Sequence, residues 1–198
     1  MLLTATALLA TLLSPQAGDT TVAVSRGTRL SVNNHAGRIT VTAWNRDEVQ
    51  IRSVSSDDDA DIRVERSGNE LLVSQRMRYG PTEIDLTINA PAWMALSLQG
   101  IETEIVVSGT AAPVRAQSVE GNVTVSGGTD NVALSSVDGD VSAAGGRVSI
   151  EDTVNGDVAA FGGSVELRAK VKDDARITGG EVLVHGTIGD DLLAAGGT

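Results

Sequence analysis

The chain has 198 residues, 41% of them hydrophobic, and a formal net charge of −11. Its 15 Lys and Arg residues are outnumbered and form no cluster, which excludes a surface for nucleic-acid phosphates and disfavours binding to an anionic lipid surface. The absence of cysteine excludes disulfides, thiolate metal sites and cysteine nucleophiles. Aromatic residues make up only 2%, which suits a core of thin layers of Val, Ile, Leu and Ala.

The first 13 residues (MLLTATALLATLL) are an uncharged apolar run, too short to span a bilayer. Ser14-Pro15-Gln16-Ala17 follows and offers a cleavage point before Gly18. This pattern predicts a signal peptide over residues 1–17 and an exported product in the periplasm, on the outer surface or outside the cell. The alternative is that the run is a buried first strand or helix. No later segment could span a membrane.

Residues 18–99 are predicted to form irregular strands and hairpins. Two apolar stretches, residues 62–64 and 71–73, flank the turn sequence Ser67-Gly68-Asn69, which predicts a β-hairpin. Residues 84–88 alternate apolar and polar side chains, as a half-buried strand does. No linker divides the chain, so residues 18–198 are predicted to be a single domain.

Residues 100–198 repeat one pattern. Gly-Gly pairs recur with successive spacings of 18, 17, 17 and 17 residues. The pairs are Gly127-Gly128, Gly145-Gly146, Gly162-Gly163, Gly179-Gly180 and Gly196-Gly197. A turn motif of the form Val-Asp-Gly-Asp-Val, clearest at residues 137–141, precedes each of the later pairs in a constant register. Two markers in one register predict a structural repeat of about 17 residues.

Each repeat contains two short stretches with the period of a strand, and glycine-containing turns lie between them. One such unit is too small to bury its own apolar face, so the units must stack. We therefore predict a parallel β-solenoid with rungs of about 17 residues from residue 100 to the C-terminus. The predicted inward side chains are Val123, Val125, Val132, Leu134, Val141, Val148, Ile150, Val158, Val165, Leu167, Ala175, Val182, Val184 and Leu192.

The N-terminal half carries an echo of this repeat. Residues 37–41 (GRITV) resemble residues 121–125 (GNVTV). Residues 49–51 then stand in the place that residues 132–134 occupy in the later copy. The winding is therefore predicted to begin in the first half of the chain.

An acidic column is the most unusual feature of the repeat. Its members, one per rung, are Glu104, Asn122, Asp140, Asp157, Asp174 and Asp191. Two unit charges one rung apart repel by about 0.9 kcal/mol in water, so something must offset the column. Each side chain could accept backbone N–H groups in its turn. The alternative is a weak calcium candidate formed by Asp173, Asp174, Asp190 and Asp191, since hard oxygen clusters suit Ca²⁺.

No catalytic constellation is found in the sequence, and we expect no enzyme activity. The two histidines, His35 and His185, are far apart and have no metal-ligand partner nearby in sequence. No Gly-x-Ser-x-Gly elbow or phosphate-binding loop occurs. Trp44 and Trp93 are either sugar platforms or packed edge residues.

The chain resembles a bacterial family of unknown function that is called putative adhesin. The resemblance is carried by residues 32–41 (VNNHAGRITV), residues 84–91 (IDLTINAP) and the glycine-punctuated repeats. This family is related to the adhesin heads of autotransporters. The resemblance covers residues 20–198 and implies an exported β-solenoid without catalytic residues. The last four rungs also resemble bactofilins, which are polymer-forming β-helices, and this is our second choice.

These observations predict a non-catalytic exported solenoid that acts as an adhesin-like module at the cell envelope or surface. Its partners would be an envelope or surface protein or a polysaccharide. The alternative is a self-assembling scaffold, in which rods associate end to end through unpaired strand edges. The sequence leaves the ligand and the handedness of the winding open.

Overall fold

The computed structural model describes residues 19–55, 61–76, 82–129 and 131–197. The predicted signal peptide, residues 1–17, lies outside the described residues. The described part consists of strands and turns, so the expectation of an all-β fold is confirmed. It contains no helix with the length and apolar character needed to cross a membrane.

Fourteen of the strands form one sheet, and three short strands form a second one. The strands are β1 (Thr20–Ala23), β2 (Arg29–Trp44), β3 (Glu48–Ser55), β4 (Asp61–Ser67), β5 (Glu70–Arg76), β6 (Glu83–Pro91), β7 (Ala95–Thr110), β8 (Val114–Glu120), β9 (Val123–Gly127), β10 (Asn131–Asp138), β11 (Val141–Ile150), β12 (Thr153–Val154), β13 (Val158–Leu167), β14 (Lys170–Val171), β15 (Ala175–Val184), β16 (Thr187–Ile188) and β17 (Leu192–Gly196).

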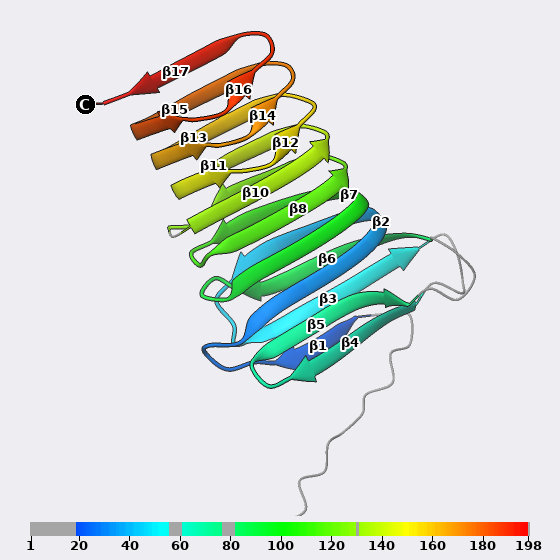
Figure 1. Ribbon diagram of the computed structural model, residues 1–198. Coiled ribbons are helices and arrows are strands. Elements are labelled where there is room, and N and C mark those ends of the chain that lie inside the picture. The colour runs from blue at the N-terminus through cyan, green and yellow to red at the C-terminus, as the bar shows by residue number, and fades with distance from the viewer. Residues whose placement is uncertain (1–18, 56–60, 77–81, 130, 198) are drawn as a thin grey trace, which may run out of the picture.

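The strands from β7 onward pair in parallel and stack along one direction, from β7 to β17 (Figure 1). The register repeats the spacing read from the sequence. Val141 lies beside Val123 and Val158 lies beside Val141, so each strand takes the place of its predecessor one turn earlier. The repeat in the sequence is therefore a repeat in space.

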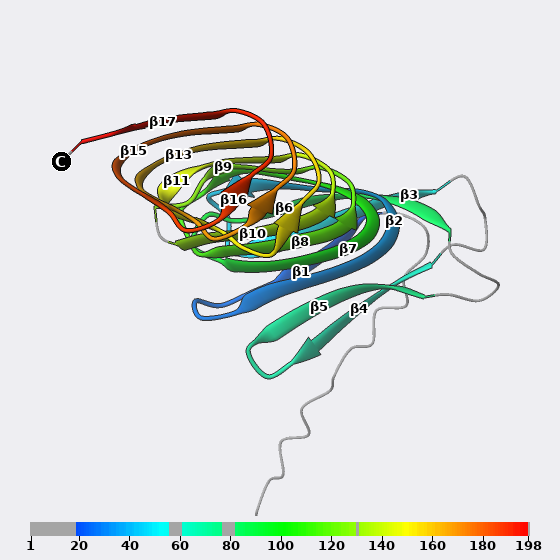
Figure 2. The same cartoon turned by 45° about the horizontal axis from the view of Figure 1, so that its top comes forward.

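Each of the later turns has three sides. β11 bends at Gly145-Gly146, so that its first half pairs with β9 and its second half pairs with β10. The third side is a short strand, and β12, β14 and β16 form the separate three-stranded sheet. Figure 2 shows these turns as nested loops that surround a common interior.

The N-terminal part is built differently, and the large sheet is mixed. β2 lies between β7 on one side and both β5 and β6 on the other, all in parallel. β1, β3 and β4 are antiparallel to the strands they pair with. The fold as a whole is therefore not a purely parallel winding.

Two expectations for this part have opposite outcomes. The hairpin predicted around residues 67–69 is confirmed, because β4 and β5 pair in antiparallel with Ser67 opposite Glu70. The placement of residues 49–51 as a copy of residues 132–134 is wrong. They lie in β3, which is antiparallel to both of its neighbours, β1 and β6, so this segment does not continue the parallel winding.

The predicted echo is correct for β2. Ile39 pairs with Ile105, which in turn pairs with Val123, so residues 37–41 and 121–125 lie two strands apart in one column. One core cluster extends from Val24 to Ile177 and includes residues of both halves. Most predicted inward side chains are part of it.

Three of the predicted inward side chains are not buried. Leu192 is 46% exposed, and Val182 and Val184 are only partly buried against the core. All three belong to β15 and β17, at the end of the stack. A side chain there has a neighbouring rung on one side only among the described residues, so it lacks half of the contacts that cover Val158 or Val165.

Candidate functional site: an uncharged groove at a corner of the winding

The acidic column of the repeat forms a ladder of hydrogen bonds between rungs from Asn122 to Asp191, whereas its first member, Glu104, pairs with Arg38. The backbone N–H of Asp140 donates to Asn122 Oδ1 over 2.8 Å, and that of Asp157 donates to Asp140 Oδ1 over 2.9 Å. The same contact joins Asp174 to Asp157 at 3.0 Å and Asp191 to Asp174 at 3.1 Å. Asn122, Asp140, Asp157 and Asp174 therefore accept backbone N–H groups, as predicted, but each N–H belongs to the next rung and not to the same turn.

The calcium candidate consists of Asp173, Asp174, Asp190 and Asp191. Asp174 and Asp191 belong to the ladder, and the backbone N–H of Asp190 donates to the carbonyl oxygen of Asp173 over 3.3 Å. Across the described ranges, no three or more His, Cys, Asp or Glu side chains are grouped so that they could hold a metal ion. The calcium alternative stays a prediction.

Both tryptophans have one ring face near an arginine. Arg46 lies 5.0 Å from the centre of the Trp44 ring, and Arg26 lies 5.8 Å from that of Trp93. The indole N–H of Trp44 donates to the carbonyl of Glu48, and that of Trp93 donates to Asp47 Oδ1. These contacts favour the packed-edge interpretation of both rings over a sugar platform.

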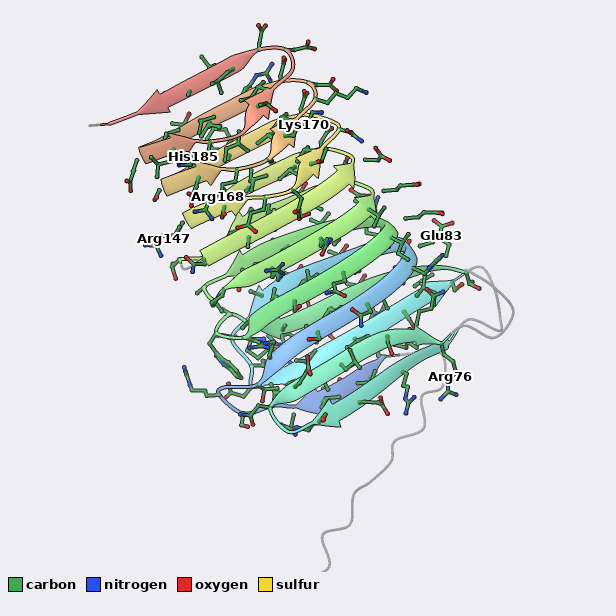
Figure 3. All side chains as sticks on the ribbon, in the orientation of Figure 1. Arg76, Glu83, Arg147, Arg168, Lys170 and His185 are labelled. Carbon is green, nitrogen blue, oxygen red and sulfur yellow. The ribbon has the colours of Figure 1, made fainter. Side chains whose placement is uncertain are left out.

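A groove of about 380 Å³ lies beside β2, β5, β7 and β8. It arises where two strands separate. β5 pairs with β2 up to Asn33, whereas β6 pairs with β2 from Ala36 onward. Asn34 and His35 therefore lack a strand partner on this side. Figure 3 labels Arg76, at the end of β5, and Glu83, at the start of β6, well apart from one another.

Side chains replace the missing strand at this corner. The Asn34 side-chain amide donates to the carbonyl oxygens of Ala36 at 2.8 Å and Ile84 at 2.9 Å. Gln75 Oε1 accepts the backbone N–H of His35 at 3.1 Å, and Gln75 Nε2 donates to the Thr82 carbonyl at 2.6 Å. These bonds hold the corner open without leaving its backbone groups unpaired.

The groove is lined mainly by amide and hydroxyl side chains and two aliphatic ones. The lining residues are Asn33, Asn34, His35, Ser74, Gln75, Gln99, Gly100, Ile101, Gln117 and Val119. None of these described lining residues is a carboxylate, lysine or arginine. Asn33, Gln99 and Gln117 are register partners on β2, β7 and β8, so their amides form a row across three strands.

Three buried polar atoms at this corner have no hydrogen-bond partner: Asn34 Oδ1, His35 Nδ1 and Thr103 Oγ1. Asn34 and His35 line the groove. Thr103 packs against Gly100, where an added Cβ would lie 2.4 Å from the Thr103 Cβ. They are the full set of such atoms in the described part of the chain. Buried polar groups are normally satisfied, so their concentration at one corner marks it as unusual.

The charged groups with shifted pKa values lie outside the groove. A hydrogen bond from Arg52 lowers the pKa of Asp19, and the same contact raises the pKa of Arg52. A hydrogen bond to Glu104 raises the pKa of Arg38. These pairs are exposed and join neighbouring strands, so they contribute to the fold rather than to a reactive site.

Sequence reasoning did not find the groove. Some of its residues lie in the segment 32–41, which carried the family resemblance. The corner depends on where β5 ends and β6 begins relative to β2, which is a long-range register. The one signal available was the concentration of amides, Asn33, Asn34, Gln75, Gln99 and Gln117, in strands that otherwise alternate Val, Ile, Leu with Ser, Thr or charged residues.

The fold resembles those of solved bacterial proteins. A putative adhesin from Bacteroides fragilis superposes with a TM-score of 0.54 over 90% of this chain and 95% of that chain, at 13% identity. A putative cell adhesion protein from Clostridium sporogenes and a putative adhesin from Parabacteroides distasonis align with TM-scores of 0.39 and 0.40, at 13% and 15% identity. They cover 89% and 90% of this chain, and this chain covers 98% and 95% of theirs. No protein-family model and no curated protein matches the chain. At these identities the likeness concerns the fold alone.

Proposed function

We propose that the chain is an exported, non-catalytic β-solenoid that acts as an adhesin-like interaction module at the cell envelope or surface. The solenoid classification rests on the parallel stack from β7 to β17, in which the β12, β14 and β16 strands supply a third side. The antiparallel strands β1, β3 and β4 line one end of it. Export rests on the signal-like residues 1–17.

The observation that carries the proposal is the character of the corner groove. It is a formed recess on a rigid sheet, which suits binding. Among the described lining residues, His35 is the one titratable side chain, and none of them is a carboxylate that could orient that imidazole toward Ser74. The groove can therefore hold a ligand by hydrogen bonds and lacks the acid–base pair that hydrolysis or transfer would need. The fold likeness to a protein named as an adhesin agrees with this role.

The proposal is tested by displaying the chain on a laboratory bacterium that does not itself adhere. Cells carrying the chain on a surface anchor should adhere to at least one polysaccharide or matrix-protein coating several times better than cells carrying the anchor alone. A second arm fuses residues 1–25 to a phosphatase that is active only after export. Adhesion at the level of the anchor alone on every coating would remove the module function, and an inactive phosphatase would remove export.

Self-assembly remains the second proposal, and one observation favours it. β17 pairs only with β15 among the described residues, and Leu192 and Leu193 beside that edge are 46% and 66% exposed. An unpaired strand edge with apolar side chains can pair with another copy. Light scattering after size-exclusion chromatography distinguishes the two proposals. A mass that grows with concentration, and that falls to the monomer in Leu193→Asp, favours the scaffold.

A further inference from the structure

We propose that the corner groove binds an uncharged, hydroxyl-rich saccharide, laid across β2, β7 and β8. This inference rests on the proposed interaction function and adds the ligand class and the residues that hold it. It follows from the charge of the lining, the row of amides, the two aliphatic side chains and the unsatisfied polar atoms, which are taken in turn.

The first step is the charge of the groove. The chain carries a net charge of −11, yet the ten described residues that line the groove include no Asp, Glu, Lys or Arg. An anionic ligand would meet no cation in the groove and would be repelled by the surrounding protein. A cationic ligand would find carboxylates elsewhere on the surface but none here. The lining therefore selects for a neutral, polar ligand.

The second step is the row formed by Asn33, Gln99 and Gln117. Each amide offers donors and an acceptor side by side, which matches a pair of neighbouring hydroxyl groups on a sugar ring. None of the three side chains has a hydrogen-bond partner among the described residues, so all three are available to a ligand. Neighbouring strands are about 4.8 Å apart, so the row presents such pairs at regular intervals.

The third step is the pair of aliphatic side chains beside the row. Ile101 and Val119 follow Gly100 and Ser118, which are register partners, so they stack on neighbouring strands at the corner. They are 44% and 39% exposed, although most large apolar side chains of the described part are buried. A sugar ring has an apolar face of C–H groups as well as hydroxyls, and these two side chains would cover it.

The fourth step is the unsatisfied polar floor. Asn34 is only 5% exposed, its amide nitrogen makes two hydrogen bonds, and its Oδ1 makes none. His35 Nδ1 is likewise buried without a partner. A buried acceptor that lacks a donor costs free energy, and a ligand hydroxyl or a water held under the ligand would supply one. The corner is therefore prepared for hydrogen-bond donors.

An extended peptide fits this groove less well. Peptides commonly bind to sheets by adding a strand to a free edge. β7 and β8 have strand partners on both sides along the groove. The gap beside β2 covers only Asn34 and His35, and Gln75 already accepts the backbone N–H of His35, so the gap is too short to take an added strand. A peptide could use only side-chain contacts, whereas a saccharide needs nothing else.

The experiment is a titration of the ¹⁵N-labelled purified chain with defined oligosaccharides, followed by NMR. The neutral probes are maltohexaose, cellohexaose, mannohexaose and chitohexaose. The comparison probes are the anionic hexagalacturonate and the peptide (Gly-Ser)₆. The groove variant is Gln99→Ala with Gln117→Ala, and the matched control is Thr87→Ala with Thr124→Ala, two polar strand positions outside the groove.

We expect saturable shifts with at least one neutral hexasaccharide, confined to residues of β2, β5, β7 and β8. The groove variant should bind it at least tenfold more weakly, and the control variant should bind it as the parent chain does. Preferred binding of hexagalacturonate or the peptide would overturn the inference. So would shifts that lie elsewhere, equal binding by the groove variant, or no binding of any neutral probe.

Failure here is distinguishable from failure of the proposed function. Displayed cells that carry Gln99→Ala with Gln117→Ala are compared with the parent in the adhesion assay. Adhesion that is undiminished by the groove variant, together with no binding of neutral probes, would leave the adhesin-like function standing and move its site elsewhere. Loss of adhesion in the parent chain itself would remove the proposed function.

Discussion

The N-terminal strands and the later rungs bury different kinds of side chain in the core. Ten of the fourteen fully buried Leu, Ile and Met side chains in the described part precede residue 110, and the other four are Leu134, Ile150, Leu167 and Ile177. Beyond these, the buried positions of the later rungs hold Val and Ala, and the series ends at Ile177. The N-terminal strands therefore bury mostly Leu and Ile, whereas the later rungs bury mostly Val and Ala and share their interior with the rungs above and below.

Strand pairing differs in the same way. In the later rungs the parallel strands pair in register, so equivalent residues of successive rungs lie side by side: Asp174 beside Asp157, and Gly179 beside Gly162. In the N-terminal part, antiparallel pairs bring unlike residues together, as with Asp19 and Arg52 across β1 and β3. A repeat therefore needs little sequence information, but each position in it must hold a side chain that can lie next to a copy of itself. In this column the carboxylates of Asp140, Asp157 and Asp174 each accept a backbone N–H, which offsets the repulsion between them.

The difference in cores predicts the largest effect. Ile88→Ala, in β6, should lower the free energy of unfolding by about 4 kcal/mol, because it leaves a cavity in the buried core. Ile177→Ala removes an equally buried side chain from β15, but it should loosen mainly the last rungs, since stacked repeats depend on their neighbours. Both tryptophans, Trp44 and Trp93, lie in the N-terminal part and report on it alone.

The measurement is chemical denaturation followed by tryptophan fluorescence and, in parallel, by far-ultraviolet circular dichroism. Ile88→Ala should shift both transitions to lower denaturant. Ile177→Ala should shift the dichroism transition and leave the fluorescence midpoint nearly unchanged. Equal shifts of both signals in Ile177→Ala would mean that the rungs and the N-terminal part unfold as one unit.

The hydrogen-bond ladder predicts an intermediate effect. Asp157→Ala removes the acceptor for the backbone N–H of Asp174 and should cost about 1 kcal/mol of unfolding free energy. Asp157→Asn keeps an acceptor oxygen and removes one like charge from the column, so it should be neutral or slightly stabilising. Asn122 already occupies this column in an earlier rung.

Urea denaturation of both variants at low salt and in 1 M salt gives the comparison. The deficit of Asp157→Ala should persist in salt, because it reflects a lost hydrogen bond. Any gain in Asp157→Asn should shrink in salt, because it reflects relieved repulsion. If Asp157→Asn were as damaging as Asp157→Ala, the carboxylate charge itself would be required at this position, and the calcium alternative would gain weight.

What could be predicted from the sequence followed the repeat. Glycine pairs and turn motifs at constant spacing predicted the rung register, the buried columns from Val123 to Ala175 and the aspartates as acceptors of backbone N–H groups. In a stack of equal units, the local sequence pattern also determines which residues pair between rungs. In the N-terminal part, the local sequence pattern does not determine which strands pair. Residues 49–51 have the alternation of a rung strand, yet they pair antiparallel with β1 and β6. Alternation sets the face of a side chain and says nothing about strand direction.

The groove could not be predicted for the same reason. It exists because β5 stops pairing with β2 at Asn33 and β6 resumes at Ala36, and no periodicity in the sequence encodes that break. The amides Asn34 and Gln75 are recognisable as a substitute for strand pairing only once the break is known. Sites that arise from interrupted regularity are the ones that a repeat-based interpretation misses.

The smallest predicted effect concerns the unlike pair of the antiparallel part. Arg52 donates two hydrogen bonds to the Asp19 carboxylate, at 2.6 and 2.7 Å, and holds the pKa of Asp19 below its ordinary value of 3.8. The pair therefore stabilises the folded chain at pH values above 3.8, and this contribution is lost as the pH falls through the lowered pKa. Carboxyl titration by NMR should show the pKa of Asp19 rising toward 3.8 in Arg52→Gln, with little change in melting temperature near neutral pH because the pair is exposed. An unchanged pKa of Asp19 in Arg52→Gln would mean that the β1–β3 edge is not held by this pair, and that backbone pairing alone joins these two strands.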